Sequence, residues 1–309
     1  MSTETTDEQQ DVTPREVVTP PRAGGRPEQQ ENEFTATRHV YEPHVVGLPK
    51  IGPYVRELWR RREFAAELSR TKLRSQHFNT VFGQLWLVLN PLLLGLVYFI
   101  LVDILRAGTR GAPFFAHLLA GIFAYYFVSG AVREAAKSVT SGGRLVLNTA
   151  FPRLLLPLAS VITGFKRFIP TFLVYIPVHL IVGLPVGWHL LWVIPIIGLL
   201  AGVAAGLSMF VAAIQVYFRD LKQFLPYVLR IWLYICPVLY YADEVPDKYK
   251  PILDVNPLGG ILTAWSDVLN GGRSPHAADM LLGLAWAAGL LVFGALFFMS
   301  REREFAVRL

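Results

Sequence analysis

Long apolar segments separated by short charged stretches occupy the chain from residue 81 to its C-terminal end. A helix that crosses a membrane needs about 20 consecutive, mostly apolar residues. Six segments are long and apolar enough: 81–102, 113–132, 156–184, 190–218, 224–242 and 278–299. The pattern therefore predicts an all-α membrane protein with six transmembrane helices.

The third of these segments has the least certain start. It carries Lys166 and Arg167, and an uncharged run begins only at Phe168. The helix could begin near Leu156 and take both basic residues into the membrane, or residues 151–167 could lie at the interface. Long basic side chains can extend back to the headgroups, which reduces the difference between the two arrangements.

Lysine and arginine are distributed unevenly between the loops on the two sides of these segments. The poorer side holds Arg106, Arg110, Lys248, Lys250 and Arg273. The richer side holds a cluster of basic residues between Arg56 and Arg74, and others after the second, fourth and sixth segments. Because basic loops favour the cytoplasm, both termini are predicted to be cytoplasmic.

The first 50 residues are polar and contain several prolines, without the apolar core of a signal peptide. We expect a disordered cytoplasmic tail over residues 1–50 and a membrane domain over residues 51–309. Within the latter, residues 53–78 predict one amphipathic helix with Trp59 on its apolar face. An interfacial helix on the cytoplasmic leaflet is favoured over a solvated helix beside the membrane.

Composition supports a membrane protein and excludes several functional classes. Hydrophobic residues make up 53% of the chain and charged residues 17%, below the roughly 25% of soluble domains. The formal net charge of +6 indicates basic flanks beside anionic lipid rather than nucleic-acid binding. The sequence has no GxxxxGK(S/T), HExxH, GxSxG or CxxC motif, so no catalytic residue is predicted and the chain holds no P-loop for ATP.

No metal site is predicted either. Cys236 is the single cysteine, and the seven histidines lack ligand spacing. The acidic residues after the fifth segment are spaced irregularly, which is typical of a solvated loop rather than a set of metal ligands.

The fourth segment contains three glycines four residues apart: Gly198, Gly202 and Gly206. Glycines at this spacing form a groove in which another helix backbone can approach closely. The pattern predicts tight helix packing, with the partner either in the same chain or in a second copy.

The fifth segment predicts a polar helix face formed by Tyr227, Arg230, Tyr234, Pro237 and Tyr241, spaced three and four residues apart. An arginine is costly on a lipid-facing surface, at about 2.5–3.5 kcal/mol at the centre of a spanning helix. We therefore expect this face to line an interior or a water-filled pathway. The alternative is that Arg230 extends to the cytoplasmic surface and the tyrosines are interfacial anchors.

Tyr125 and Tyr126 end an aromatic run in the second segment. Aromatic faces stack against the CH groups of sugar rings, and tyrosine hydroxyls bond to sugar hydroxyls. Aromatic residues near a membrane boundary are also common interfacial anchors. Together with Lys166 and Arg167, the two tyrosines complete the predicted substrate pathway.

Several motifs resemble those of one transporter family. The stretch RDLKQFLPYVLRIWLYICPVLYYADEVP, followed by NPLGGILTAWSDVLNGG, is similar to the C-terminal signature of type-2 ABC exporter permeases. Trp86, Asn90 and Pro91, the FPRLLLP of residues 151–157 and the amphipathic N-terminal helix extend the resemblance over residues 53–309. Within the family, the chain resembles the Wzm/TagG branch, and its arginine- and alanine-rich composition resembles actinobacterial members.

The resemblance implies a homodimer in the bacterial inner membrane, assembled with two copies of an ABC nucleotide-binding subunit that binds ATP and Mg²⁺. The implied substrate is a polyprenyl-pyrophosphate-linked polysaccharide of the O-antigen, galactan or teichoic-acid type. The loop over residues 141–157 would hold the helix that couples to the ATPase, through Arg144, Leu145, Asn148, Phe151 and Arg153. Residues 243–275 would form re-entrant helices on the outer side.

Three other functions remain open from the sequence. A type-2 permease for a small hydrophobic drug or lipid would have an apolar lining. A membrane glycosyltransferase would need positioned carboxylates on one loop face. A passive channel would conduct without ATP.

Overall fold

The computed structural model describes residues 49–76, 85–105, 111–143 and 151–308, and the regular secondary structure in these ranges is helical throughout. The predicted tail over residues 1–50 lies outside this part of the chain, apart from its last two residues.

Within the described ranges, five helices are long and apolar enough to cross a membrane. They are α3 (Trp86–Leu105), α4 (Gly111–Ala136), α7 (Leu155–Val182), α8 (Val193–Tyr217, after the 3-10 turn η2, Trp188–Trp192) and α12 (Ala277–Arg301). These helices match the first, second, third, fourth and sixth predicted segments. Because α7 begins at Leu155, both Lys166 and Arg167 lie inside the helix. The helix ends at Val182 and is followed by the capping residue Gly183, whose φ of 76° is a left-handed conformation that glycine adopts easily.

The fifth predicted segment forms a shorter helix, α9 (Leu221–Ile235), of 15 residues. At 1.5 Å per residue it spans about 22 Å, less than the roughly 30 Å of a hydrocarbon core. The helix stops before Pro237, which has no N–H to continue it. The polar face predicted to reach Tyr241 therefore ends at Tyr234, which corrects that prediction.

The amphipathic segment also differs from its prediction. It forms two helices, α1 (Ile51–Arg60) and α2 (Arg62–Gln76), with a break at Arg61. Ala65 and Ser69 of α2 are buried against α7, whereas Trp59 of α1 is 69% exposed. The apolar pattern predicts one lipid-facing surface, but its second half covers protein.

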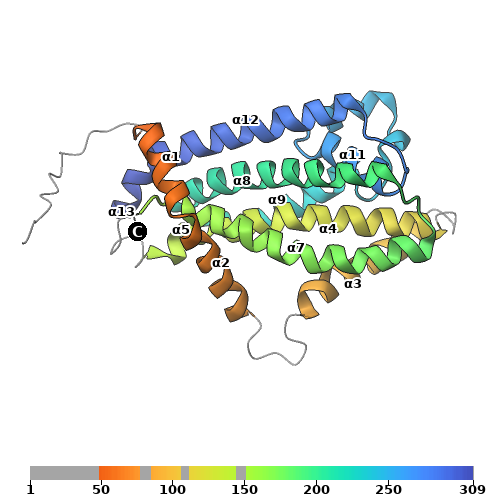
Figure 1. The fold of residues 1–309 in the computed structure, drawn as a ribbon, viewed down its shortest axis with the longest axis horizontal. Helices are drawn as coiled ribbons and strands as arrows, with labels where there is room; N and C mark the ends of the chain where they lie inside the picture. Colours follow the sequence, from red (N-terminus) through yellow and green to blue (C-terminus); the bar gives the residue numbers. More distant parts are fainter. Residues whose placement is uncertain (1–48, 77–84, 106–110, 144–150, 309) are drawn as a thin grey trace, which may run out of the picture. The chain divides into compact units, whose positions relative to one another are not determined.

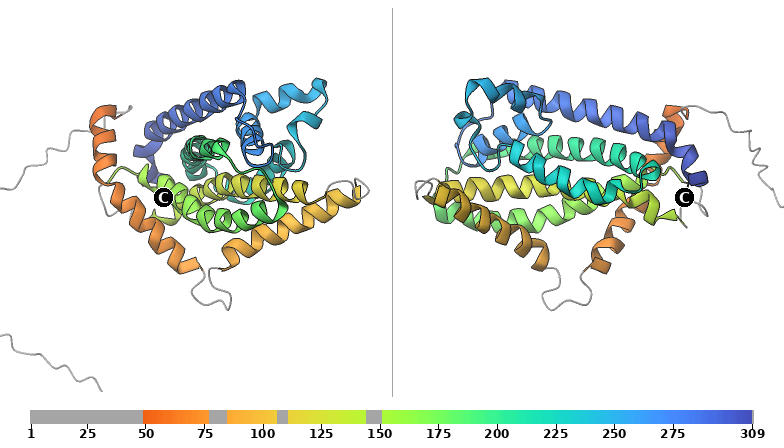
Figure 2. Two further views of the ribbon diagram at one scale, coloured as in Figure 1. Left: turned by 45° about the vertical axis from the view of Figure 1, so that its right-hand side comes forward. Right: turned by 180° about the vertical axis from the view of Figure 1, so that it is seen from behind.

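The long helices pack around α4, which is the most deeply buried of them. Helices α7, α8, α3 and α9 contact α4, and α12 packs on α8 (Figures 1 and 2). Helices α1 and α2 cross one end of this bundle, where the short helices α5 (Ser138–Ser141), η5 (Glu302–Glu304) and α13 (Phe305–Arg308) also lie (Figure 1).

The glycines of α8 bring it into backbone contact with α12. A Cβ atom on Gly206 would overlap the backbone of Leu290, and one on Gly294 of α12 would overlap the carbonyl group of Gly206. A Cβ on Gly202 would lie 3.1 Å from the Cβ of Ala287, whereas Gly198 has nothing within 4 Å. Two of the three glycines therefore pack against a helix of the same chain.

The opposite end of the bundle holds the segment expected to be re-entrant. It forms η3 (Ala242–Glu244), η4 (Asp247–Tyr249), α10 (Lys250–Val255) and α11 (Gly259–Leu269). Helix α11 contacts α4, α8 and α12, and the indole of its buried Trp265 donates to the Ala120 carbonyl at 3.1 Å. This helix is thus part of the protein interior.

The guanidinium of Arg273, just after this segment, forms ion pairs with two carboxylates. It lies 2.6 Å from Asp267, whose side chain is only 8% exposed, and 3.5 Å from Asp243, which is 83% exposed. Arg273→Gln leaves a buried carboxylate poorly compensated, so we expect a loss of roughly 1–3 kcal/mol, read as a lower unfolding temperature of the purified chain.

Asp243→Asn is the matched control, since an exposed ion pair contributes about 0–1 kcal/mol. Equal unfolding temperatures for the two variants would contradict the stabilising role assigned to the ion pair of Arg273 with Asp267.

Candidate functional site

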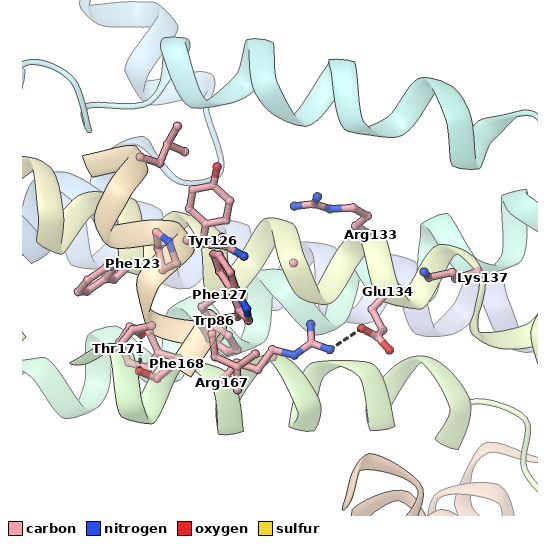
Figure 3. A pocket seen from close by; sticks show the side chains of 16 residues that line it. Trp86, Phe123, Tyr126, Phe127, Arg133, Glu134, Lys137, Arg167, Phe168 and Thr171 are labelled. Atoms are coloured by element: carbon pink, nitrogen blue, oxygen red, sulfur yellow. Dashed lines mark hydrogen bonds and ion pairs between the residues drawn. The ribbon is translucent and has the colours of Figure 1, made fainter. Parts of the chain in front are cut away.

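A cavity of about 540 Å³ lies between α3, α4 and α7. Its lining divides into two chemically different ends (Figure 3). Aromatic side chains line one end, and charged side chains line the other, toward the end of the bundle where α5 lies (Figures 1 and 3).

The charged end is built mainly by the last turns of α4. Arg133 and Glu134 are adjacent in the last turn of α4, and Lys137 follows four and three residues later, just past the end of the helix, so that all three line the cavity. From α7, the Arg167 guanidinium reaches Glu134 with Nη2 2.9 Å from Oε2. From α2, Lys72 Nζ lies 3.8 Å from Oε1 of the same carboxylate. Burial lowers the pKa of Lys72, and the negative charge of Glu134 opposes that shift.

The aromatic end combines residues of three helices: Trp86 of α3, Phe123, Tyr126 and Phe127 of α4, and Phe168 of α7. The rings of Phe127 and Phe168 lie 5.6 Å apart, and the Arg133 side chain extends toward Tyr126 (Figure 3). Such surfaces offer both apolar contact and a hydroxyl, which suits the faces of sugar rings or an isoprenoid chain.

A second aromatic contact joins α3 to α9. The hydroxyl groups of Tyr98 and Tyr234 are 3.3 Å apart, with their rings edge to face. Helix α9 packs on α4 through Leu225, Leu229 and Leu233. Its opposite face carries Tyr227, Arg230 and Tyr234, which are all exposed in a single chain, and Tyr234 also reaches Tyr98 of α3.

The structure brings some of the predicted pathway residues together. Tyr126 and Arg167 line the cavity, and Arg230 and Tyr234 share the outer face of α9 with Tyr227. Whether substrate passes along them stays a prediction.

Three other predicted pathway residues lie elsewhere. Tyr125 is buried and donates to the Leu229 carbonyl, so it packs α4 against α9. Lys166 donates to the Ala66 carbonyl of α2 at 3.3 Å. Tyr241, just before η3, packs against His117 with the two rings tilted and their centroids 4.3 Å apart.

Sequence reasoning missed Glu134 and Lys72 as members of the site. Each looks like an ordinary loop or flank charge in the sequence. The one available signal was the unpaired appearance of Arg167 in an apolar segment, which implies a buried acidic partner somewhere in the chain.

The segment predicted to couple to an ATPase meets two other parts of the chain. Phe151 lies 5.2 Å from Phe64 of α2, between ring centroids. The backbone N–H of Arg153 donates to the Glu302 carboxylate, and its guanidinium donates to the Glu302 carbonyl. Of the other predicted coupling residues, Arg144, Leu145 and Asn148 lie outside the described residues.

Glu302 also accepts a hydrogen bond from the Tyr54 hydroxyl of α1. Burial, and after it the Glu302 carboxylate, raise the pKa of Tyr54 above its usual value, so the phenol stays protonated and donates. One carboxylate therefore ties the start of α7, helix α1 and the end of α12 together.

Within the described ranges, no three His, Cys, Asp or Glu side chains gather as a set of metal ligands. The arrangement instead offers a cavity that can bind a ligand with an anionic part and an apolar or sugar part.

Comparisons with known proteins identify the family of the chain. Residues 66–268 match the family described as ABC-2 type transporter. The chain is 28% identical over 202 residues to a protein of Klebsiella pneumoniae named O-antigen export system permease protein RfbA, covering 65% of this chain and 77% of that protein. It is 28% identical over 259 residues to the protein of that name from Myxococcus xanthus, covering 82% of this chain and 97% of the relative.

Proposed function

Because the chain belongs to the ABC-2 type transporter family, we propose that it exports a polysaccharide linked to a polyprenyl pyrophosphate carrier. The observation that carries the proposal is the cavity with a cationic end and an aromatic end, in a chain whose relatives are named as O-antigen export permeases. O-antigen, galactan and teichoic-acid polymers all fit this description.

Membership of the family implies a multi-pass membrane protein that pairs with an ABC ATPase subunit. In our proposal the complex is a homodimer of this chain with two copies of that subunit, which binds ATP and Mg²⁺. The ATPase would dock on residues 141–157, including Arg144, Leu145, Asn148, Phe151 and Arg153.

The proposed topology has six spans and two cytoplasmic termini. Helix α9 with the residues after it would supply the sixth crossing, and α10 and α11 would enter the membrane from outside. Helix α1, with Trp59 exposed, would lie on the cytoplasmic leaflet.

The proposed mechanism assigns different tasks to charge and to aromatic surface. Arg133, Arg167 and Arg230 draw the pyrophosphate of the carrier to the cytoplasmic side. Tyr126, Tyr227 and Tyr234 offer weak stacking surfaces, which let the glycan move without being trapped. The exposed face of α9 would complete the channel against a second copy.

Deletion of the gene in a cell that encodes this chain tests the proposed function directly. Removing the chain should lower the polymer on the outer face at least tenfold and leave carrier-linked polymer inside, and a plasmid copy should restore export. Measurement is by surface glycan labelling and by extraction of lipid-linked polymer. Normal export in its absence would refute the function.

The alternative of a permease for a small hydrophobic drug or lipid is less well supported. Its cavity should be lined by apolar groups, whereas Arg133, Lys137 and Arg167 line this one. In that case, Arg230→Gln and Tyr234→Ala would leave polymer export unchanged.

A further inference from the structure

A second cavity, of about 280 Å³, lies at the end of the bundle opposite α1, where α7 turns back into α8 (Figure 1). Ile176, Leu180 and Val186 line it and are themselves exposed, so the cavity is a groove that opens on the surface of the protein. The lining comes from four segments: Phe172, Tyr175, Ile176, His179 and Leu180 of α7, Val186 and Leu190 of the turn, Val193 of α8 and Leu269 of α11.

The polar groups beside this groove bind one another. The carbonyl of Pro185 can only accept, and the Nε2 atoms of His179 and His189 lie 3.2 and 3.3 Å from it, so both imidazoles donate to it. The Tyr175 hydroxyl lies 3.4 Å from Nδ1 of His179 and donates to that atom. Among the described residues that line the groove, none is Asp, Glu, Lys or Arg. The lining therefore offers hydrocarbon contact and nothing that would select a charged headgroup.

The walls of the groove are held in place by packing. Along the inner wall, the ring centroid of Phe172 lies 6.0 Å from that of Tyr175 and 5.7 Å from that of Trp265 in α11. At the turn, a Cβ atom on Gly272 would lie 2.6 Å from the Pro185 ring, so the turn rests on the residues that follow α11. Walls fixed in this way do not collapse to fill the volume, and an empty groove would forfeit dispersion contacts.

The surroundings of the groove determine what fills it. Leu173 and Ile181 of α7 and Ile194 of α8 are exposed and apolar, as expected of a lipid-facing surface in a multi-pass membrane protein. Trp188, in the turn, is also exposed, and tryptophan is enriched where a membrane meets water. The groove therefore opens into the hydrocarbon layer near its edge, where lipid chains take the place of water. The dimer contact proposed above uses α9, which does not line the groove.

We propose that this groove binds one hydrocarbon chain of a bilayer phospholipid. The chain fills the space between α7 and α8 and contacts Leu269, so it supports α11 from the lipid side. Since nothing in the lining selects a headgroup, the most abundant lipid of the membrane occupies the groove rather than the polyprenyl carrier. The site lies outside the proposed export pathway and does not depend on the identity of the polymer.

Retention of lipid by the full chain in complex with its ATPase tests this inference. The complex is reconstituted with a phosphatidylethanolamine that carries a diazirine on one acyl chain, transferred into a steroid-based detergent, washed and then irradiated. A chain in the groove contacts protein on several sides and a chain on the outer surface on only one, so the former should leave more slowly. We expect peptide mapping to find retained label at Ile176 and Leu190, and little at Leu173 and Ile194.

Filling the groove should remove this label. Leu190→Trp is expected to lower the retained label about tenfold, because the indole takes the volume of the chain. Leu191→Trp is the matched control, since Leu191 is exposed and lies outside the lining, and its label should match that of the unchanged chain. Ile176→Trp and Leu173→Trp repeat the comparison on α7, where both positions are partly exposed and should accept an indole without loss of folding.

Three results would overturn the inference. The first is the absence of retained label in the unchanged chain, or an equal loss of label in a groove variant and its control. The second is displacement of the label by a polyprenyl phosphate at a lower concentration than by unlabelled phospholipid, which would make the carrier the occupant. The third is a disulfide between two copies of an Ile176→Cys variant, which would mean that the groove closes on a second subunit. Label is measured without export, so each of these results leaves the proposed function standing.

Discussion

Replacing Gly206 by leucine is expected to prevent α8 from packing on α12 and to leave little folded protein in the membrane. A Cβ atom at this position overlaps the backbone of Leu290, which cannot move aside as a flexible side chain could. The cost should reach or exceed the roughly 3 kcal/mol at the upper end of ordinary overpacking. The amount of monodisperse protein extracted in detergent measures the effect.

Gly198→Leu is the control for this substitution. It places the same side chain on the same helix, two turns earlier, where nothing lies within 4 Å of the added Cβ. We expect its yield to be close to that of the unchanged chain. Similar losses in the two variants would mean that leucine harms α8 for reasons other than contact with α12.

Substituting Glu302 with alanine is expected to lower polymer export at least tenfold while the ATPase continues to hydrolyse ATP. The change removes the acceptor for the Tyr54 hydroxyl and for the Arg153 N–H. Each hydrogen-bonding group left unsatisfied lowers the free energy of unfolding by about 1–3 kcal/mol. The contact that Glu302 makes between α1, α7 and α12 should therefore weaken. In the proposed complex, this contact lies beside residues 141–157. If it is weak, movement of the ATPase would not be transmitted to the membrane helices.

Export and ATP hydrolysis should be measured on the same preparation. Glu304→Gln is the comparison, because Glu304 lies two residues away but is 43% exposed and bonds to Tyr217. Its export should stay near normal. If the Glu302→Ala variant exports polymer at the normal rate, the Glu302 contact has no part in coupling ATP hydrolysis to export.

The sequence predicted those parts of the fold that depend on uniform hydrophobicity. Segment 278–299 matches α12 within two residues at each end, and segment 81–102 ends three residues before α3 ends, since a long apolar run with at most one charge has one stable arrangement in a membrane. It could not predict where α7 begins, because snorkelling makes two starts nearly equal in energy. The sequence also did not predict the break at Arg61. Nor did it predict that α2 packs on protein, since amphipathic periodicity alone does not distinguish lipid from protein as the covering surface.

The site was predicted only in part, and geometry explains the difference. Tyr125 and Tyr126 are adjacent in sequence, but a helix turns about 100° per residue, so one packs on α9 and the other lines the cavity. Arg167 was recognisable from its cost inside an apolar segment. Its partner Glu134 is 33 residues away, and a single sequence carries no record of such a contact.

The contact between Gly206 and Gly294 also constrains how the subunit can move. Sliding α8 along α12 by a single residue would push a Cβ atom into the place where two backbones now touch. Helices α8 and α12 should therefore move as one rigid unit during a transport cycle. The mobile walls would then be α3, where Gly95 alone is buried, and α9, which is attached through one leucine face, the Tyr125 hydrogen bond and the contact with Tyr98. Labels that report distance should record change between α3 and α9 and none between α8 and α12.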